Sequence, residues 1–138
     1  MKKIFLIVCI VCACFSLFSC NAPEDFIPTE DTVCGTYVWE KEGFGSPFTI
    51  TLKADGSCSY YIGMLSSHIG LGSWSLADGI VTMKENENGL GQTNLFHFRV
   101  EADALIFIDD ASDAFQAVGV SDGDRFSRTT DDDLYVEL

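Results

Sequence analysis

The sequence predicts an all-β domain, built as an antiparallel meander that closes into a barrel of about eight strands. From Val33 onward, no stretch keeps apolar residues at helical spacing for the length of a helix. Short runs of alternating apolar and polar residues recur instead, and three Asp-Gly dipeptides separate some of them. A meander of this length removes its exposed edges by closing on itself. A two-sheet sandwich fits the same pattern and stays open as the alternative.

Alternating runs between turn dipeptides predict eight or nine short strands. Alternation is without error in Phe48–Lys53 and Phe96–Glu101, where every second side chain falls on the same face. Asp-Gly favours hairpins because the turn needs positive φ at its central positions. The expected strands cover, in order, residues 34–41, 48–53, 57–62, 72–76, 80–84, 96–101, 104–108, 115–120 and 125–128.

The inward face of these strands is expected to be rich in bulky rings. The expected inward residues are Tyr37, Trp39, Trp74, Phe96, Phe98, Phe107 and Phe115, together with Ile50, Leu52, Leu76 and Leu105. A barrel of about eight strands is just wide enough to be filled by side chains or to hold one small ligand. So many rings favour filling, and a pocket for an apolar ligand is the alternative.

The N-terminus predicts a signal peptide over residues 1–19. Lys2 and Lys3 form a short positive region, and Ile4–Phe18 is an uncharged apolar run. As a helix rising about 1.5 Å per residue, this run spans roughly 22 Å, less than the roughly 30 Å hydrocarbon core of a membrane. The length therefore favours a signal peptide over a transmembrane helix, with an uncleaved signal anchor as the alternative.

Leu17-Phe18-Ser19-Cys20 resembles the lipobox of bacterial lipoproteins, with a small residue directly before the cysteine. The resemblance implies cleavage before Cys20, lipid on its sulfur, and an acyl chain such as palmitate on the new N-terminus. Two or more chains give stable anchoring, whereas one gives marginal affinity. A competing motif ends at Cys14, but apolar rather than polar residues follow it.

Glu24-Asp25 also resembles the surface-export signal of Bacteroidetes lipoproteins. We therefore expect attachment to a membrane of the bacterial cell envelope, at the outer membrane or cell surface.

Charge and composition predict how the chain is divided into segments and which partners it does not bind. Residues 20–32 predict a lipidated cysteine and an acidic tether, 33–128 the β domain, and 129–138 an acidic C-terminal tail. A net charge of −13 without a basic cluster argues against nucleic acid as a partner, because phosphate binding needs Lys and Arg. The apolar fraction of 47% is too high for a disordered chain. We expect a monomer.

The domain also resembles a known class of fold. Gly35-Thr36-Tyr37 at the first strand, the segment Gly-Ser-Trp-Ser-Leu-Ala-Asp-Gly at 72–79, and the Ala-Asp-Gly turns look like those of small lipocalin-like domains in bacterial envelope lipoproteins. The resemblance covers roughly residues 33–128. It implies a calyx-type barrel and brings no catalytic residues with it.

The cysteines and histidines of the predicted domain do not indicate a disulfide, a metal site or a catalytic site. Export would permit a Cys34–Cys58 disulfide, but sequential hairpins would place the two cysteines roughly 9–10 Å apart, beyond the roughly 7 Å limit for a bridge. Two free, small apolar residues are the favoured interpretation. His97 alternates with phenylalanines and should face solvent, while His68 falls in a connection. No spacing typical of a metal site or a catalytic triad occurs, so we expect no enzyme activity, no metal and no cofactor.

Three acidic clusters, at 109–113, 122–124 and 131–133, could supply carboxylates for calcium. None has the ligand spacing of a calcium-binding loop, so solvated loop charge is the favoured interpretation.

Two expected connections are unusually apolar. Phe44 lies between two glycines, and the segment 63–72 carries Met64, Leu65, Ile69 and Leu71 among three glycines. Phe44, Met64, Leu65 and Ile69, if exposed, would form a contact patch for a protein or glycan partner. The alternative is that the longer segment plugs the barrel mouth. The sequence thus favours a non-catalytic interaction module, with a carrier of a small apolar ligand as the second hypothesis.

Overall fold

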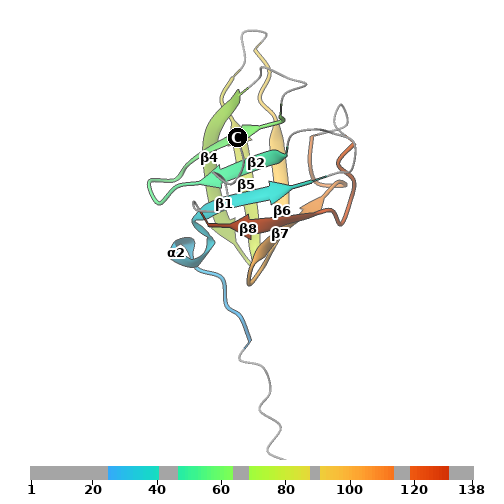
Figure 1. Cartoon of the computed structure of the whole chain (residues 1–138). Coiled ribbons are helices and arrows are strands. Elements are labelled where there is room, and N and C mark those ends of the chain that lie inside the picture. The colour runs from blue at the N-terminus through green and yellow to red at the C-terminus, as the bar shows by residue number, and fades with distance from the viewer. Residues whose placement is uncertain (1–24, 41–46, 64–68, 88–90, 114–118, 131–138) are drawn as a thin grey trace, which may run out of the picture.

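Eight antiparallel strands form one closed barrel in sequence order (Figure 1). The computed structural model describes residues 25–40, 47–63, 69–87, 91–113 and 119–130. The strands are β1 (Gly35–Trp39), β2 (Phe48–Leu52), β3 (Ser57–Tyr61), β4 (Ile69–Ala77), β5 (Ile80–Glu85), β6 (Leu95–Glu101), β7 (Ala104–Ile108) and β8 (Arg125–Thr129), and the helix α2 (Glu30–Val33) precedes them. Because β8 pairs with β1, the predicted barrel is confirmed and the sandwich alternative is wrong.

Most of the expected strands match the observed ones to within one or two residues at each end, and two of them differ by more. The segment predicted as 72–76 is the longer strand β4, which begins at Ile69. In the segment predicted as 115–120, Gly119 and Val120 are not in a strand, and residues 115–118 lie outside the described residues. In addition, β8 includes Thr129, which was assigned to the C-terminal tail.

The early start of β4 involves two glycines: Gly72, which began the expected strand, and Gly70, which was expected to lie in the connection before it. A Cβ at Gly70 would lie 2.0 Å from a ring atom of Tyr60, and one at Gly72 would lie 2.1 Å from the backbone oxygen of Lys84. Glycine inside a strand often marks such a close approach. Gly70 and Gly72 are therefore strand residues that leave room for neighbours in the barrel.

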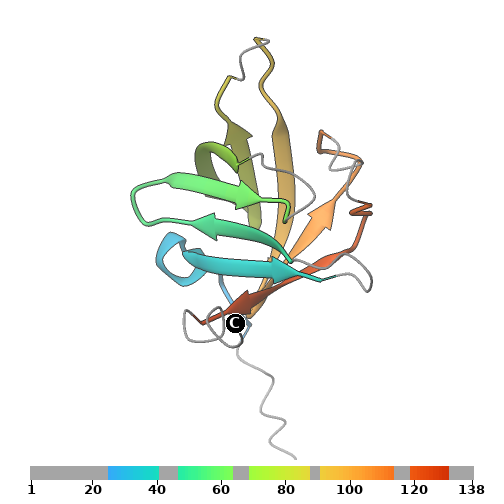
Figure 2. The same cartoon turned by 45° about the horizontal axis from the view of Figure 1, so that its top comes forward.

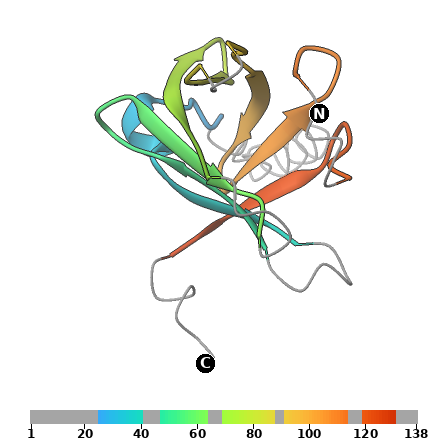
Figure 3. The same ribbon diagram turned by 90° about the horizontal axis from the view of Figure 1, so that it is seen from above.

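The two ends of the barrel differ. At one end, here called the basal end, short turns join β2 to β3, β4 to β5 and β6 to β7, and α2 leads into β1. At the other, the distal end, longer connections join β1 to β2, β3 to β4, β5 to β6 and β7 to β8. The strands surround a common interior (Figure 3), and β5 and β6 reach furthest at the distal end (Figure 2).

The basal end is closed by the helix and by an arginine from the last strand. Val33 of α2 is fully buried, and its carbonyl oxygen accepts a hydrogen bond from the Tyr37 hydroxyl at 2.7 Å. Arg128 donates to the backbone oxygen of Thr32 and, at 2.7 Å, to the Tyr37 hydroxyl oxygen. Its guanidinium carbon lies 5.2 Å from the Tyr37 ring centroid, within range of a cation–π contact. The last strand is thus tied to the chain just before the first.

A connected set of aromatic rings crosses the barrel interior. Phe126 contacts Trp39, Phe48 and Phe98 at centroid distances of 6.1, 5.2 and 5.6 Å. Tyr60 on β3 meets Phe96 on β6 at 5.6 Å, although these strands are not neighbours in the sheet. Rings from opposite walls therefore touch across the interior.

Most of the expected inward residues are buried. Tyr37, Trp39, Trp74, Phe96, Phe98, Phe107, Ile50, Leu52 and Leu105 are buried in the core, and Leu76 packs against it half-buried. Phe115 lies outside the described residues. The sequence analysis did not place Phe48, Tyr60, Met83 or Phe126 in the core, and all four are buried there.

Candidate interaction surface and interior polar cluster

Of the four residues predicted to form a contact patch, one, Ile69, is among the described residues. Phe44, Met64 and Leu65 lie outside the described residues. Ile69 is the first residue of β4 and is 60% exposed. It is therefore a strand residue on the outer wall rather than a loop residue, because β4 starts earlier than the alternation suggested.

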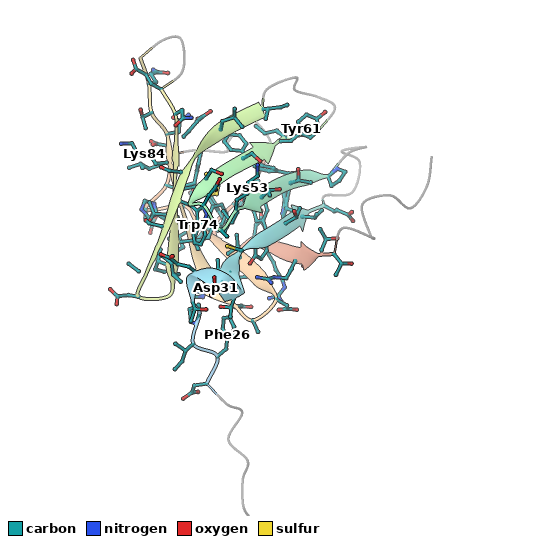
Figure 4. All side chains as sticks on the ribbon, turned by 90° about the vertical axis from the view of Figure 1, so that its left-hand side faces the viewer. Phe26, Asp31, Lys53, Tyr61, Trp74 and Lys84 are labelled. Atoms are coloured by element: carbon teal, nitrogen blue, oxygen red, sulfur yellow. The ribbon has the colours of Figure 1, made fainter. Side chains whose placement is uncertain are left out.

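Ile69 belongs to a small apolar group on the outer wall. It pairs with Tyr61 of β3, and Leu71, two residues along β4, is 57% exposed. Since alternate residues share a face, Tyr61, Ile69 and Leu71 point outward together. Figure 4 shows Tyr61 toward the end of the molecule opposite Phe26 and Asp31.

The outward positions within the neighbouring strands β1 to β5 are not acidic, although acidic residues lie at the strand ends: Glu40 follows β1, and Asp55 Oδ1 accepts a hydrogen bond from Ser57 Oγ at 2.6 Å. Outward positions of β1 to β5 are Thr36, Val38, Thr49, Thr51, Ser57, Ser59, Tyr61, Ile69, Leu71, Ser73, Ser75, Ala77, Ile80, Thr82 and Lys84. We call this surface the β1–β5 wall. Lys84 is the charged residue within it, and Lys53 and Asp55 lie just beyond it between β2 and β3. In a chain of net charge −13, these strands therefore offer a largely uncharged surface to a partner.

A buried carboxylate lies inside the barrel near the distal end. Glu85 is 7% exposed, and its Oε2 accepts a hydrogen bond from Asn94 Nδ2 at 2.7 Å. The Glu85 backbone N–H also donates to the Asn94 carbonyl oxygen at 2.9 Å. Burial and a hydrogen bond to Glu85 raise the pKa of the Tyr60 hydroxyl well above its ordinary value. Neutral donors on β3 and before β6 thus hold this carboxylate and join three parts of the distal end.

This cluster was not predicted from the sequence, although the alternation in β5 contains a signal for it. Val81 and Met83 are inward residues of β5, so one more alternate position places residue 85 on the same inward face. The expected strand ended at Lys84, which left Glu85 in a connection. Its burial then depends on Tyr60 and Asn94, whose positions no local pattern reveals.

Both described cysteines are free thiols, so the disulfide left open by the sequence does not form. Gly35, the residue after Cys34, pairs with Leu52, and Leu52 pairs with Cys58, so strand β2 separates the two cysteines. Burial and the nearby Glu85 carboxylate raise the pKa of Cys58 to about 11. Burial, followed by Asp31 and Glu30, raises the pKa of Cys34. Both thiols are therefore protonated at neutral pH and are poor nucleophiles.

His97 faces outward as expected, but it is half-buried rather than fully solvated. Its backbone N–H donates to Ser112 Oγ at 2.7 Å, so the segment after β7 lies against this part of β6. Its Nδ1 is buried without a hydrogen-bond partner in the described part of the chain. His68 lies outside that part.

The acidic segments between β7 and β8 organise the backbone around them. Asp113 Oδ2 accepts from Leu95 N at 2.8 Å, and Asp122 Oδ1 accepts from Asp109 N at 3.0 Å. Asp124 Oδ2 caps the backbone N–H of Ser121 at 2.8 Å. Over the described ranges, no group of three or more potential ligand residues is placed to hold a metal ion. The third cluster, 131–133, lies outside these ranges.

Comparisons with protein-family models, with curated proteins and with solved structures find no match to this chain. In the described part of the chain, no helix has the length and apolar character needed to cross a membrane.

Proposed function

We propose that this protein is a lipid-anchored protein of the bacterial cell envelope that acts by binding rather than by catalysis. Cys20 is the proposed lipidation site, and residues 1–19 are the proposed signal peptide. The proposed partner is a protein or a glycan that meets the distal half of the barrel.

The observation that carries this proposal is the placement of the N-terminal segment. Residues 25–29 run into α2 at the basal end (Figure 1), where a Cβ at Gly79 would lie 3.9 Å from Pro28. Nine residues, 21–29, separate Cys20 from Glu30 and can extend to about 30 Å. A lipid on Cys20 would hold the basal end near the membrane. The distal connections and the group Tyr61, Ile69 and Leu71 would then face away from it.

Chemistry supports binding over catalysis in this proposal. The thiol of Cys58 is protonated and buried, and the Glu85 carboxylate is held by neutral donors. A nucleophile needs a neighbouring base that is itself oriented by a third group. The β1–β5 wall instead has two features of an interface core, because charged residues are few within its strands and Tyr61, Ile69 and Leu71 gather there.

A carrier of a small apolar ligand is the second candidate, because the closed barrel matches the calyx that the lipocalin-like resemblance implies. The ring network argues against it. Phe126, Phe48, Tyr60 and Phe96 link β8, β2, β3 and β6 through the interior. A small-molecule site needs roughly 300 Å³ or more, and packed rings occupy the space in which it would lie.

If Cys20 is lipidated, Cys20→Ala should move the protein out of the membrane fraction or leave it unprocessed. Cys14→Ala is the matched control and should leave the protein in the membrane fraction. The measurement is immunoblotting of carbonate-washed membranes, with metabolic labelling by an alkyne fatty acid. Equal membrane retention and equal labelling of both variants would show that the anchor is assigned wrongly.

If the barrel is filled, the protein should bind environment-sensitive fatty-acid probes no more tightly than about millimolar. The measurement is a fluorescence titration of the protein in dilute non-ionic detergent, with detergent alone as the blank. A saturable one-to-one complex at about micromolar affinity, with quenching of tryptophan emission, would make the carrier the better candidate.

A further inference from the structure

Two adjacent apolar side chains are exposed shortly before α2. Phe26 is 40% exposed and Ile27 is 77% exposed. The other exposed large hydrophobic residues of the described ranges lie on strands toward the distal end: Ile69, Leu71 and Leu95. Figure 4 shows Phe26 beyond Asp31, at the end of the molecule opposite Tyr61. Phe26 and Ile27 therefore form a separate apolar group at the basal end, here called the basal pair.

The chain that follows the basal pair is fixed to the barrel. Thr29 caps α2 through a capping box with Thr32. A Cβ at Gly79, in the turn after β4, would lie 3.9 Å from Pro28. Val33, at the end of α2, is fully buried in the core. A contact made by the basal pair would therefore orient the whole barrel.

The proposed lipid on Cys20 would keep the basal pair close to a bilayer surface. Six residue steps join Cys20 to Phe26, so their Cα atoms can be at most about 22 Å apart. A contact made over so short a connection is an intramolecular event, with an effective concentration of about millimolar. Even a weak preference of these two side chains for lipid would then be sufficient to hold them there.

The small size of the basal pair favours lipid over another protein as its partner. A stable protein interface buries roughly 800 Å² on each side, far more than two partly exposed side chains offer. Single apolar side chains can instead enter the boundary between headgroups and acyl chains, as those of interfacial helices do. Removing their apolar surface from water favours this contact.

The charges around the basal pair limit the kind of lipid that it can meet. Residues 25–33 include Asp25, Glu30 and Asp31 and no basic residue. The neighbouring turns and strand ends carry acidic and basic side chains in balance: Asp55, Asp78, Glu101 and Asp103 on one side, and Lys53, Arg99, Arg125 and Arg128 on the other. The basal end thus has a small excess of negative charge, which disfavours anionic lipid and is compatible with net-neutral lipid.

We propose, on the basis of the lipid anchor at Cys20 proposed above, that Phe26 and Ile27 enter the surface of the same bilayer and make a second membrane contact. The two contacts together would hold the barrel with its basal end against net-neutral lipid. The distal end would then be directed toward the partner.

The direct test measures how deeply the basal pair lies in lipid. Full-length protein is extracted from membranes in detergent and reconstituted in phosphatidylcholine vesicles, with a nitrobenzoxadiazole label on Ile27→Cys. Ile69→Cys is the matched control, because Ile69 is also an exposed isoleucine but lies at the distal end. Lipids that carry a nitroxide near the headgroup should quench the label severalfold more at position 27 than at position 69. The parent, treated with label in parallel, reports any reaction of Cys34 and Cys58.

A second reporter excludes insertion by the label itself. A label on Asp31→Cys lies in α2, so its quenching reports how close the basal end is to the lipid. Phe26→Ser combined with Ile27→Ser should reduce quenching at position 31 severalfold, and Ile27→Ser alone should reduce it by less. Unchanged quenching at position 31 in a natively folded double variant would overturn the proposal. If the double variant does not fold, unchanged quenching with Ile27→Ser alone would do so.

The outcomes separate this contact from the anchor. A parent that does not float with the vesicles would overturn both the anchor and the contact. A parent that floats, with position 27 quenched no more than position 69, would overturn the contact alone. Replacing part of the phosphatidylcholine by phosphatidylglycerol should weaken quenching at position 27 at low salt, where repulsion is least screened. Stronger quenching on the anionic vesicles would overturn the assignment to net-neutral lipid.

Discussion

Phe126→Ala is expected to lower the free energy of unfolding by about 3–5 kcal/mol, the usual range for removing a buried phenylalanine. Phe126 is fully buried, and its ring contacts Trp39, Phe48 and Phe98. These partners belong to β1, β2 and β6, so one truncation would leave a cavity shared by several strands. A loss of this size is a large part of the roughly 5–15 kcal/mol that stabilises a domain.

Chemical denaturation followed by circular dichroism measures this effect. Ser127→Ala is the control, because the neighbouring side chain on β8 faces solvent and its loss should change stability by less than about 0.5 kcal/mol. If Phe126→Ala unfolds at the same denaturant midpoint as the parent, the ring does not join the walls of the barrel. If the variant fails to fold, Phe126→Leu should still fold, with a smaller loss.

Trp74→Ala should produce a loss of similar size, about 3–5 kcal/mol, for two combined reasons. Trp74 lies in the core cluster, so truncation removes a large packed surface. Its Nε1 also donates to the backbone oxygen of Lys53 at 2.8 Å, so truncation leaves that carbonyl without this donor. The bond joins the centre of β4 to the turn after β2.

Trp74→Phe separates the two contributions. It keeps an aromatic ring and removes the N–H, so it should cost about 1 kcal/mol from the hydrogen bond, plus a smaller packing loss. Ser75→Ala, one residue along on the exposed face of β4, is the matched control and should be near neutral. Equal losses for Trp74→Phe and Trp74→Ala would mean that the hydrogen bond, rather than packing, dominates. A Trp74→Ala variant as stable as the parent would mean that the strand faces the other way.

Much of the fold could be predicted from local pattern. Alternation in Phe48–Lys53 and Phe96–Glu101 located β2 and β6 correctly, because a strand with one buried face must alternate. The Asp-Gly dipeptides at 55–56 and 78–79 fall in the observed turns, where Gly56 and Gly79 have φ of +80° and +73°. At these positions the backbone requirement is local and can be read from the dipeptide.

The candidate site was less predictable, since it depends on partners distant in sequence. Gly70 was expected in a connection, but it lies within β4, where the Tyr60 ring approaches so closely that a side chain would not fit. The outward direction of Ile69 could be assigned only in the structure, where β4 begins three residues before the expected strand.

By itself, the sequence determined the all-β class, most strand positions and the inward direction of residues such as Trp74, because periodicity and turn chemistry act over a few residues. Only the tertiary structure decided that Phe126 packs against three strands, that Glu85 is buried beside Asn94, and that Tyr60 meets Phe96 across the interior. Each of these depends on strand register and barrel closure, which bring residues far apart in the chain to within a few ångströms. Such contacts leave no periodic trace in either segment, so no local pattern specifies them.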